Sequence, residues 1–598
     1  MGARSRARER KRATATVPEP APNVGRRQAW LFGAGLFVVA LAVRVLFWQA
    51  TPDRAWPYSA WYKGDAPVWM DYAQALQSGR AFELGLPIHP PGAGYLVAAL
   101  WDGRAHGFGG LRFAWALMGA LVVVLVYTAV LRSFGPVVAT ITGWLCAASS
   151  GLLILGSSIN NEVPYLLLVA GALALWEDVR AGGVPGLVAF AALNGIACLF
   201  RVEHLLCFAL LLALLAFAWR RAGWKPTAAR TALALTAFVV PLVPWHVHAW
   251  SGIERFNEGP RVFEPAEEAA IGQVERALSG VTLRPDAVAR REELPTFLRR
   301  TTSVFVAATV AHRGGREVRA EDFGILEEAF GYVPRPLARH PFVSSYGPLN
   351  FYLANRPGTS GGFDRSPLNE PPPLEGGRER YPVFLVQGLP PADLAFVYPP
   401  HVRLFNDGYR LGWQGIRARP GDWLALCARK VRILWSGAAL GLGGFDLPLG
   451  QGGLRRAVDL VVPEGPLATI WRVLVLGVCA AGLAAGWKRS GLAPWLALLA
   501  SKLVATVLFF GYARQGATMM PVVALLAALA IERHALPRMP RLTARRAAVL
   551  GAIALTAPVV LESARWLSRP AVTIDGRAIG AADPFPVREH RDQVLDVR

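Results

Sequence analysis

The sequence is poor in charged residues and in cysteine. Only 18% of its 598 residues are charged, whereas 53% are hydrophobic. A soluble chain of this length would need several domains with charged surfaces, so the composition argues against a soluble protein. The five cysteines form no C-x-x-C pair, which argues against a disulfide framework or a cysteine-based metal cluster. We interpret them as buried, unreactive thiols.

Several motifs of soluble enzymes are also missing. The sequence has no Walker loop, no persuasive G-x-G-x-x-G fingerprint and no H-E-x-x-H spacing, so neither an ATP site nor a nucleotide-sugar site is indicated. No cofactor is predicted, and a requirement for a divalent metal is left open. The net charge of +21 is carried mainly by the N-terminal arm and by short loops. That distribution is typical of cytoplasmic loops of membrane proteins and predicts no nucleic-acid partner.

Long apolar runs are the dominant feature of the sequence. A helix that crosses a bilayer needs about 20 mostly apolar residues, because no water is present there to satisfy the backbone. The pattern predicts an all-α polytopic membrane protein with about eleven spans. We expect these spans at Trp30–Trp48, Leu111–Val130, Gly135–Ser149, Val163–Trp176, Val184–Phe200, Leu205–Trp219, Thr231–Trp250, Leu467–Trp487, Trp495–Phe510, Thr518–Ile531 and Ala547–Leu561.

The spans fall into two blocks on either side of a long polar insert. We expect five segments: a disordered basic cytoplasmic arm (1–27), an N-terminal transmembrane block (28–250) with a first outer loop at 49–110, an extracytoplasmic insert of mixed structure (251–421), an interfacial helix with a C-terminal transmembrane block (422–563), and an extracytoplasmic tail (564–598). The interfacial helix is expected at 422–440, where an apolar side alternates with basic residues.

The charges of the loops predict the orientation of the chain. With the arm in the cytoplasm, the basic loops near Arg132, Arg180, Arg220–Arg230 and Lys488–Arg489 also fall inside. The first outer loop, the insert and Arg514 then fall outside. Candidate functional residues near the outer ends of the spans would therefore share one side of the membrane.

Three residues stand out as candidates, and each has two interpretations. Asp65 precedes a helical stretch, so it is either an N-cap or a reactive carboxylate. Arg514 lies at the outer end of a predicted span, where it either binds an anion or snorkels to the interface. Arg112, at the start of the second span, has the same two interpretations.

Other polar residues lie at the ends of spans. Arg201 and Glu203 are between two spans and either contact a substrate or form a local ion pair that turns the chain. The segment Asn160–Glu162 precedes a span and is interpreted as a helix cap. His89 precedes two prolines and is more easily explained as structural than as a ligand.

Scattered motifs resemble a known enzyme family. They are Gly64-Asp65, Tyr72-Ala-Gln-Ala-Leu-Gln-Ser-Gly79, His89-Pro-Pro-Gly-Ala-Gly-Tyr-Leu96, Leu111-Arg112-Phe113, Pro244-Trp245-His-Val-His248, Pro348-Leu-Asn350-Phe-Tyr-Leu-Ala-Asn355 and Arg514 to Pro521. In this order they resemble the GT-C membrane glycosyltransferases, in particular the bacterial relatives of protein O-mannosyltransferases and lipid A aminoarabinose transferases. The sequence departs from the family at Ala66, where many members have a second acid, and at His248 and Ala249, which replace an Arg-Asn pair.

The resemblance implies a function and a set of site residues. An acid in the first outer loop is the catalytic carboxylate of such enzymes, which implies that Asp65 is the base. The implied donor is a polyprenyl-phosphate-linked sugar, whose anionic phosphate Arg514 and Arg112 would bind. Arg201, Glu203, His89, Asn350 and Asn355 are the possible substrate-binding or scaffold residues. The expected protein is an inverting glycosyltransferase on the outer face of a bacterial cytoplasmic membrane, surrounded by membrane lipid, with a glycan, lipid or protein as acceptor.

Two alternatives remain on the sequence alone. A transporter or flippase for an amphipathic lipid-linked substrate would also be polytopic, although it would favour internal repeats and polar residues at the midplane. A catalytically degenerate family member would fit the altered family motifs. Turnover of a lipid-linked sugar distinguishes the enzyme from both.

Overall fold

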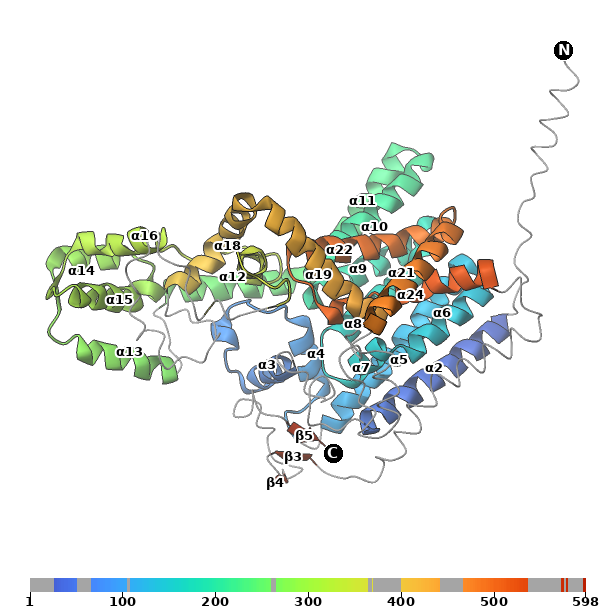
Figure 1. Ribbon diagram of the computed structural model, residues 1–598, viewed down its shortest axis with the longest axis horizontal. Helices are drawn as coiled ribbons and strands as arrows, with labels where there is room; N and C mark the ends of the chain where they lie inside the picture. The colour runs from blue at the N-terminus through green and yellow to red at the C-terminus, as the bar shows by residue number, and fades with distance from the viewer. Residues whose placement is uncertain are drawn as a thin grey trace, which may run out of the picture.

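The computed structural model describes residues 26–50, 66–104, 108–259, 265–363, 368, 399–440 and 466–535, together with three short strands near the C-terminus. Asp65, residues 1–25 of the N-terminal arm and the predicted span at 547–561 lie outside these described residues. The ribbon separates into a bundle of long helices and a group of shorter helices that projects from one end (Figure 1). The projecting helices come from residues 265–330.

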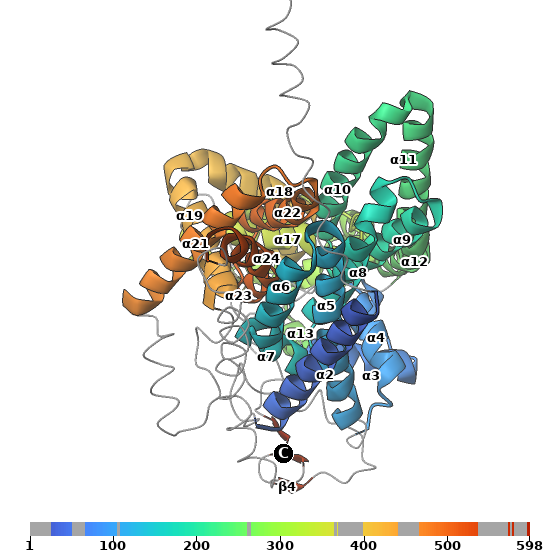
Figure 2. The ribbon, with the colours of Figure 1, turned by 90° about the vertical axis from the view of Figure 1, so that its right-hand side faces the viewer.

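The N-terminal block is built from apolar helices that pack side by side. Its helices are α2 (Arg26–Ala50), α3 (Ala66–Ser78), α4 (Gly92–Leu100), α5 (Phe108–Phe134), α6 (Pro136–Ala148), α7 (Ser150–Ser157), α8 (Glu162–Arg180), α9 (Val184–Phe200), α10 (His204–Trp219), α11 (Trp224–Val239) and α12 (Val243–Glu258), with short 3₁₀ turns η1 (Glu83–Gly85), η3 (Arg220–Ala222) and η4 (Val240–Leu242). The helices α2, α5 and α6 contact one another and run side by side (Figure 2). Gly135 separates α5 from α6 with a φ of 88°, a conformation that glycine adopts without strain.

The insert has a core of its own. Its elements are α13 (Pro265–Ala277), β1 (Thr282–Leu283), α14 (Pro285–Glu292), η5 (Thr296–Leu298), α15 (Arg299–His312), β2 (Glu317–Val318), η6 (Ala320–Gly324), α16 (Ile325–Phe330), α17 (Tyr346–Asn355) and α18 (Pro399–Ala418). Strands β1 and β2 pair in parallel. The core of the insert also contains Leu86 and Ile88 from the first outer loop and Phe510 from the end of a late helix. The insert therefore packs on the first outer loop instead of forming a separate domain.

The C-terminal block completes the bundle. It contains α19 (Pro420–Leu440), α21 (Pro466–Gly486), η10 (Ser490–Leu492), α22 (Ala493–Leu508), α23 (Ala513–Ala517), α24 (Met520–Ala530) and a π-helical turn, η11 (Ile531–Ala535). Helix α24 packs on α6 and on α21, so the two membrane blocks share one hydrophobic core. Near the C-terminus, β3 (Val572–Ile574) pairs in antiparallel fashion with β4 (Arg577–Ala578) and β5 (Leu595–Val597).

The number of helices able to span a membrane differs from the prediction of about eleven. Six helices of the described part are long and apolar enough, and a seventh is obtained if α6 and α7, bent by 57°, form one broken span. The predicted spans Val184–Phe200 and Thr518–Ile531 are found as short helices of 17 and 11 residues. The protein is thus a multi-pass helical membrane protein in which several apolar runs are too short to cross alone.

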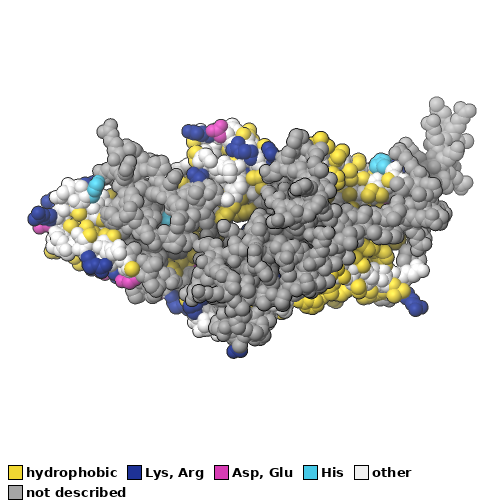
Figure 3. Space-filling model, turned by 60° about the horizontal axis from the view of Figure 1, so that its bottom comes forward, with side chains coloured by type: hydrophobic (Ala, Val, Ile, Leu, Met, Phe, Trp, Pro, Cys, Tyr) yellow, Lys and Arg dark blue, Asp and Glu magenta, His cyan; other side chains and the backbone are white. Residues whose placement is uncertain are grey.

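The surface agrees with membrane embedding. Large apolar side chains are exposed on the long helices, among them Trp30 and Val38 on α2, Phe217 on α10 and Val473 on α21. Figure 3 shows hydrophobic side chains over the half that contains these helices, and Lys and Arg side chains at the end formed by the insert. Such exposed apolar area is expected where lipid, not water, covers the protein.

Candidate active site

Two arginines from distant segments meet at one buried carboxylate. Glu162 opens α8 and is fully buried. Arg201, directly after α9, forms an ion pair with its Oε1 atom, and Arg514 on α23 places its Nε atom 3.4 Å from the same oxygen. Both guanidinium groups are largely shielded from solvent. The other oxygen, Glu162 Oε2, is buried and has no hydrogen-bond partner among the described residues.

A second polar contact joins the same two segments. Lys502 on α22 lies 3.3 Å from Glu203 Oε1, and it donates a hydrogen bond of 3.2 Å to Gln515 Oε1. Gln515 in turn donates to Glu203 Oε1 at 3.1 Å. Arg201 and Glu203 belong to the turn between α9 and α10, whereas Arg514 and Gln515 are neighbours on α23. The turn between α9 and α10 and helix α23 therefore each supply one residue to the contact at Glu162 and one to the contact at Lys502.

The cluster gathers ionisable side chains of both signs in a buried place. Within the described part of the chain it contains three cationic side chains, Arg201, Lys502 and Arg514, and two carboxylates, Glu162 and Glu203. Burying charge is costly unless it is paired, and guanidinium and ammonium groups fixed in such a site can also bind an anionic ligand. The arrangement can therefore stabilise negative charge, such as a phosphate or a developing anion.

His204 links the cluster to the interior of the bundle. Its Nε2 atom lies 2.8 Å from Asn194 Oδ1, and its Nδ1 atom lies 3.0 Å from the hydroxyl of Tyr165. Because Asn194 Nδ2 already donates to the Phe190 carbonyl, its oxygen accepts, and Nε2 of His204 carries the hydrogen. Tyr165 then donates to Nδ1. The ring of Tyr165 also lies 4.5 Å from Lys502 Nζ, which connects this chain of contacts to the charged cluster.

Arg112 supports the segment that leads to Glu162. It is almost fully buried on α5, and both Nε and a terminal nitrogen donate to the Ser157 carbonyl at 3.4 Å. Three residues further along α5, Trp115 donates to the Asn160 carbonyl at 2.9 Å. These bonds attach α5 to the connection between α7 and α8.

The predicted helix cap is only partly present at the start of α8. The side-chain oxygen of Asn160 accepts from the backbone N–H of Val163 at 3.0 Å, so Asn160 has the capping role. Glu162 pairs instead with Arg201 and Arg514. Arg201 and Glu203, interpreted from the sequence as a possible local ion pair, also contact residues far along the chain.

Asn355 and Asn350 lie on α17, in the insert. Asn355 donates to the Leu508 carbonyl at 2.8 Å and accepts from Lys430 Nζ at 3.0 Å. Lys430 also donates to the Val507 carbonyl at 3.1 Å, and burial lowers the pKa of this lysine to about 8. Asn355 thus holds α17, α19 and the end of α22 together. The Oδ1 atom of Asn350 is buried without a partner among the described residues.

His89 lies in the first outer loop beside the insert. Its Nδ1 atom contacts Glu83 Oε1, and its backbone N–H donates to Glu83 Oε2 at 3.0 Å. The ring packs against Tyr346, with centroids 5.0 Å apart, and against Trp69. These contacts fit a scaffold role at the junction of loop and insert.

Asp65 directly precedes Ala66, the first residue of α3, and lies outside the described residues. The structure therefore brings together Arg201, Glu203 and Arg514 among the predicted residues, with Arg112 attached to the same connection. No group of three or more His, Cys, Asp or Glu side chains in the described ranges is placed to hold a metal ion.

Two residues of the cluster were missed in the sequence, Lys502 and Gln515. Lys502 stands inside a run otherwise rich in leucine and alanine, and a lysine at such a position is itself a signal of function or of a buried partner. The sequence contains no comparable signal for Gln515. The role of Glu162 was also missed, because an acid at a helix start is usually explained as part of a cap.

A family comparison covers much of this site. Residues 88–245 match the family model for dolichyl-phosphate-mannose-protein mannosyltransferases, and this segment includes Arg112, Glu162, Arg201 and Glu203. The match confirms the resemblance to the GT-C membrane glycosyltransferases over about a quarter of the chain. It supports a membrane glycosyltransferase in general. No curated protein matches the sequence.

Solved structures of membrane proteins are similar at low identity. The oligosaccharyltransferase AglB from Archaeoglobus fulgidus, in complex with an inhibitory peptide and a dolichol-phosphate, has a TM-score of 0.35 and 13% identity, over 92% of this chain and 56% of that chain. An oligosaccharyltransferase from Archaeoglobus fulgidus in complex with zinc and sulfate has a TM-score of 0.35 and 14% identity, over 91% of this chain and 53% of that one. ArnT from Cupriavidus metallidurans bound to undecaprenyl phosphate has a TM-score of 0.31 and 15% identity, over 84% and 78%. The chain thus spans about half the length of the archaeal chains.

Proposed function

We propose that this membrane protein, which resembles the GT-C glycosyltransferases, transfers a sugar from a polyprenyl-phosphate donor to an extracytoplasmic acceptor with inversion at the anomeric carbon. The convergence of Arg201 and Arg514 on Glu162 is the observation that carries this proposal. The family whose model matches acts with dolichyl-phosphate mannose by its description, a donor of the same chemical class. We place the protein in a bacterial cytoplasmic membrane with its active site on the outer face.

The phosphate of the donor would be held by the arginines. A polyprenyl-phosphate sugar keeps its tail in the bilayer and its phosphate at the surface, so the leaving group is an anion that needs cationic partners. Arg514 and Arg201 are the candidates, because both lie at the buried carboxylate of Glu162. Glu162 would fix the two guanidinium groups before the donor arrives, which is the purpose of a preorganised site. Arg112 would contribute indirectly, by holding the connection that carries Glu162.

The transfer itself would use Asp65 as the general base. Its carboxylate would take the proton of the acceptor hydroxyl as that oxygen attacks the anomeric carbon. The bond between the anomeric carbon and the phosphate oxygen breaks, and the polyprenyl phosphate leaves as an anion next to Arg514. Attack from the face opposite the leaving group gives inversion.

Turnover by Asp65→Asn tests this proposal. The protein is reconstituted in lipid nanodiscs and supplied with polyprenyl-phosphate sugars and candidate acceptors. Removing a general base is worth about 10²–10⁴-fold in rate, so we expect kcat to fall at least a hundredfold while the KM for the donor stays nearly unchanged.

Asp71→Asn is the matched control. Asp71 is the next acid along the chain, on α3, and it is paired with Arg80 at 2.6 Å. This variant should keep wild-type turnover within about twofold. Full activity of a folded Asp65→Asn protein, judged by an unchanged thermal midpoint, would reject Asp65 as the base. Absence of turnover with any lipid-linked sugar in the wild type would reject the transferase and leave a transporter or an inactive relative.

A further inference from the structure

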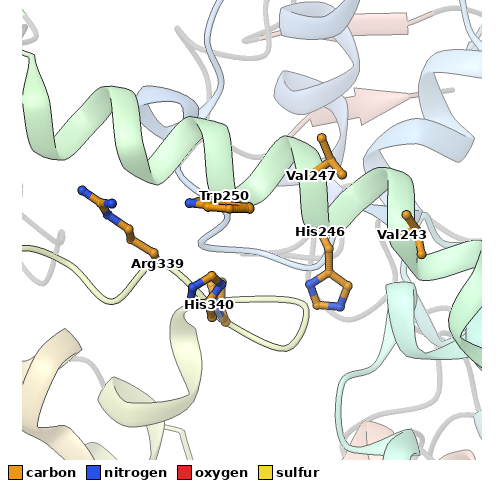
Figure 4. Close-up of a pocket in the computed structure, with 7 residues that line it drawn as sticks. Val243, His246, Val247, Trp250, Arg339 and His340 are labelled. Carbon is orange, nitrogen blue, oxygen red and sulfur yellow. The ribbon is translucent and has the colours of Figure 1, made fainter.

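A pocket lies between α12 and a segment of the insert. Its volume is about 290 Å³, and it is lined by Val243, His246, Val247, Trp250, Arg339, His340 and Pro341. Figure 4 shows the side chains of α12 on one side and Arg339 and His340, from the facing loop, on the other. Small-molecule sites typically measure about 300–1,000 Å³, so this pocket has room for one ring of a ligand.

The facing segment is fixed to α12 at both ends. We call residues 337–343 the strap. At one end, Asn257 donates to the Leu337 carbonyl at 2.9 Å and accepts from the Leu337 N–H at 3.0 Å. At the other, Trp245 donates to the Val343 carbonyl at 2.6 Å. The side chains of Asn257 and Trp245 are buried, so buried hydrogen bonds fix both ends of the strap to α12.

The pocket lies along the part of a candidate membrane span that leads into the insert. The apolar helical unit from Trp224 to Glu258 contains 35 residues, which corresponds to about 50 Å at 1.5 Å per residue. A bilayer core is about 30 Å thick, so one end of the unit extends beyond it. Of the lining residues, Val243 and Val247 come from the first turns of α12, Trp250 lies further toward its end at Glu258, and Arg339 comes from the insert. Tryptophan is typical of the interface between lipid and water.

The charge of the pocket is compensated. Arg339 lies 3.7 Å from Glu254 and 3.3 Å from Glu258, so two carboxylates already neutralise its guanidinium group. An anionic headgroup would compete with both acids. The other polar groups facing the pocket are the imidazoles of His246 and His340. This set favours a neutral ligand with several hydroxyl groups over a phosphate.

Trp250 offers a flat apolar face. Trp250 is 47% exposed. The ring centroids of Trp250 and His340 are 5.4 Å apart. A sugar ring has an apolar face of C–H groups and a rim of hydroxyls. The face would pack on the indole, and the rim would exchange hydrogen bonds with the imidazoles.

We propose that the pocket between α12 and the strap binds a sugar ring carried at the membrane surface, as the sugar part of a glycolipid acceptor. This inference rests on the proposed function for its acceptor role, although the binding of sugar can be measured without turnover. The apolar lining of Val243 and Val247 then faces the lipid portion of the same molecule. If the pocket binds such a sugar, the acceptor of the proposed transferase is a glycolipid.

Binding of soluble sugars tests the pocket. The full chain in phosphatidylcholine nanodiscs is examined by saturation-transfer difference NMR with methyl glycosides of glucose, mannose, galactose and arabinose, and empty nanodiscs give the blank. Detergents with sugar headgroups are avoided, because they would occupy the site. We expect transfer to at least one glycoside, and at least a threefold loss of it in Trp250→Ala.

Two further variants make the result specific. Trp224→Ala removes another exposed tryptophan of the same helical unit, 76% exposed and outside the pocket, and should leave the transfer unchanged. His340→Ala removes a possible hydrogen-bond partner of the sugar while leaving the sequence of α12 unchanged. This variant should weaken the saturation transfer. Asp65→Asn should bind sugar as well as the wild type does, so failure of catalysis and failure of the pocket are separable.

Other outcomes would overturn the proposal. Equal transfer in Trp250→Ala and wild type, or no transfer to any glycoside, would show that the pocket does not bind sugars. Transfer to glycerol 1-phosphate that depends on Trp250, without transfer to sugars, would assign the pocket to an anionic lipid headgroup instead.

Discussion

At the scale of single residues, the charges around Lys502 are buried and paired with each other. Lys502 is almost fully buried, and its described polar partners are Glu203 and Gln515. A buried pair gains little over an apolar replacement, but breaking it by removing one partner costs about 3–5 kcal/mol. Such a pair in a membrane helix is therefore retained for position or function more than for stability.

Substituting Lys502 and Glu203 together should lower the thermal midpoint by less than the sum of the shifts caused by the two single substitutions. Lys502→Met leaves Glu203 with one fewer partner, so we expect a clear fall in the thermal midpoint in nanodiscs. Lys502→Met combined with Glu203→Gln should recover part of that fall, because no unpaired carboxylate remains.

Lys225→Met provides the control, since Lys225 is exposed beside Trp224. Its midpoint should stay close to that of the wild type. If the double variant shows the full sum of both losses, Lys502 and Glu203 do not act as a pair.

At the scale of elements, glycines decide how closely helices approach. A Cβ atom at Gly437 on α19 would lie 1.7 Å from the Ala513 carbonyl, and one at Gly516 on α23 would lie 1.9 Å from the Leu434 carbonyl. Glycine is thus required where α19 crosses α23, as is common for small residues in membrane bundles. Because Ala513 precedes Arg514, this crossing also sets the position of the arginine at Glu162.

Gly437→Ala should push α23 away and displace Arg514. Overpacking costs about 1–3 kcal/mol, and a shift of about 1 Å near reacting groups can cost about a hundredfold in rate. We therefore expect a lower thermal midpoint, a raised KM for the donor and at least a tenfold loss of turnover.

Gly477→Ala is the matched control for this change. Gly477 lies inside α21 with no atom within 4 Å of an added Cβ, so alanine there should be neutral or slightly stabilising. Identical behaviour of the two variants in midpoint and turnover would refute the role of the α19–α23 crossing.

At the scale of the whole molecule, the basic ends of several helices gather in one place. Arg132 at the end of α5 pairs with Asp178 on α8, and Arg489 lies over the ring of Phe134 while pairing with Glu532 at 2.8 Å. These residues come from loops predicted to be cytoplasmic. Their association fits a single cytoplasmic face, which we predict lies opposite the face that holds Glu162 and the insert.

Cysteine labelling in cells tests this orientation. Ser279→Cys lies on the exposed surface of the insert, and Ala222→Cys lies on the exposed turn η3. A membrane-impermeant maleimide should label Ser279→Cys in intact cells and Ala222→Cys only after lysis. The background is clean because four native cysteines are buried and the half-buried Cys427 can be changed to serine. The reverse labelling pattern would invert the topology and move the site to the cytoplasm.

Much of the helical content was predictable because it is a local property. The expected span Val184–Phe200 coincides with α9, and Leu467–Trp487 differs from α21 by one residue at each end. Apolar composition and flanking glycine, proline or basic residues determine these boundaries. The number of membrane-crossing helices was not predictable in the same way, since short runs such as α24 are stabilised by neighbouring helices instead of by their own length.

The sequence by itself determined that this chain is a helical protein embedded in a membrane; the common side of its basic loops and the insert between two blocks of helices stay predictions. Each of these follows from the length and composition of continuous segments. Only the tertiary structure decided that Arg201 and Arg514 share the carboxylate of Glu162, and that Lys502 reaches Glu203 across 299 positions. Such pairings depend on how closely helices cross, which is set by packing between residues that no local pattern connects.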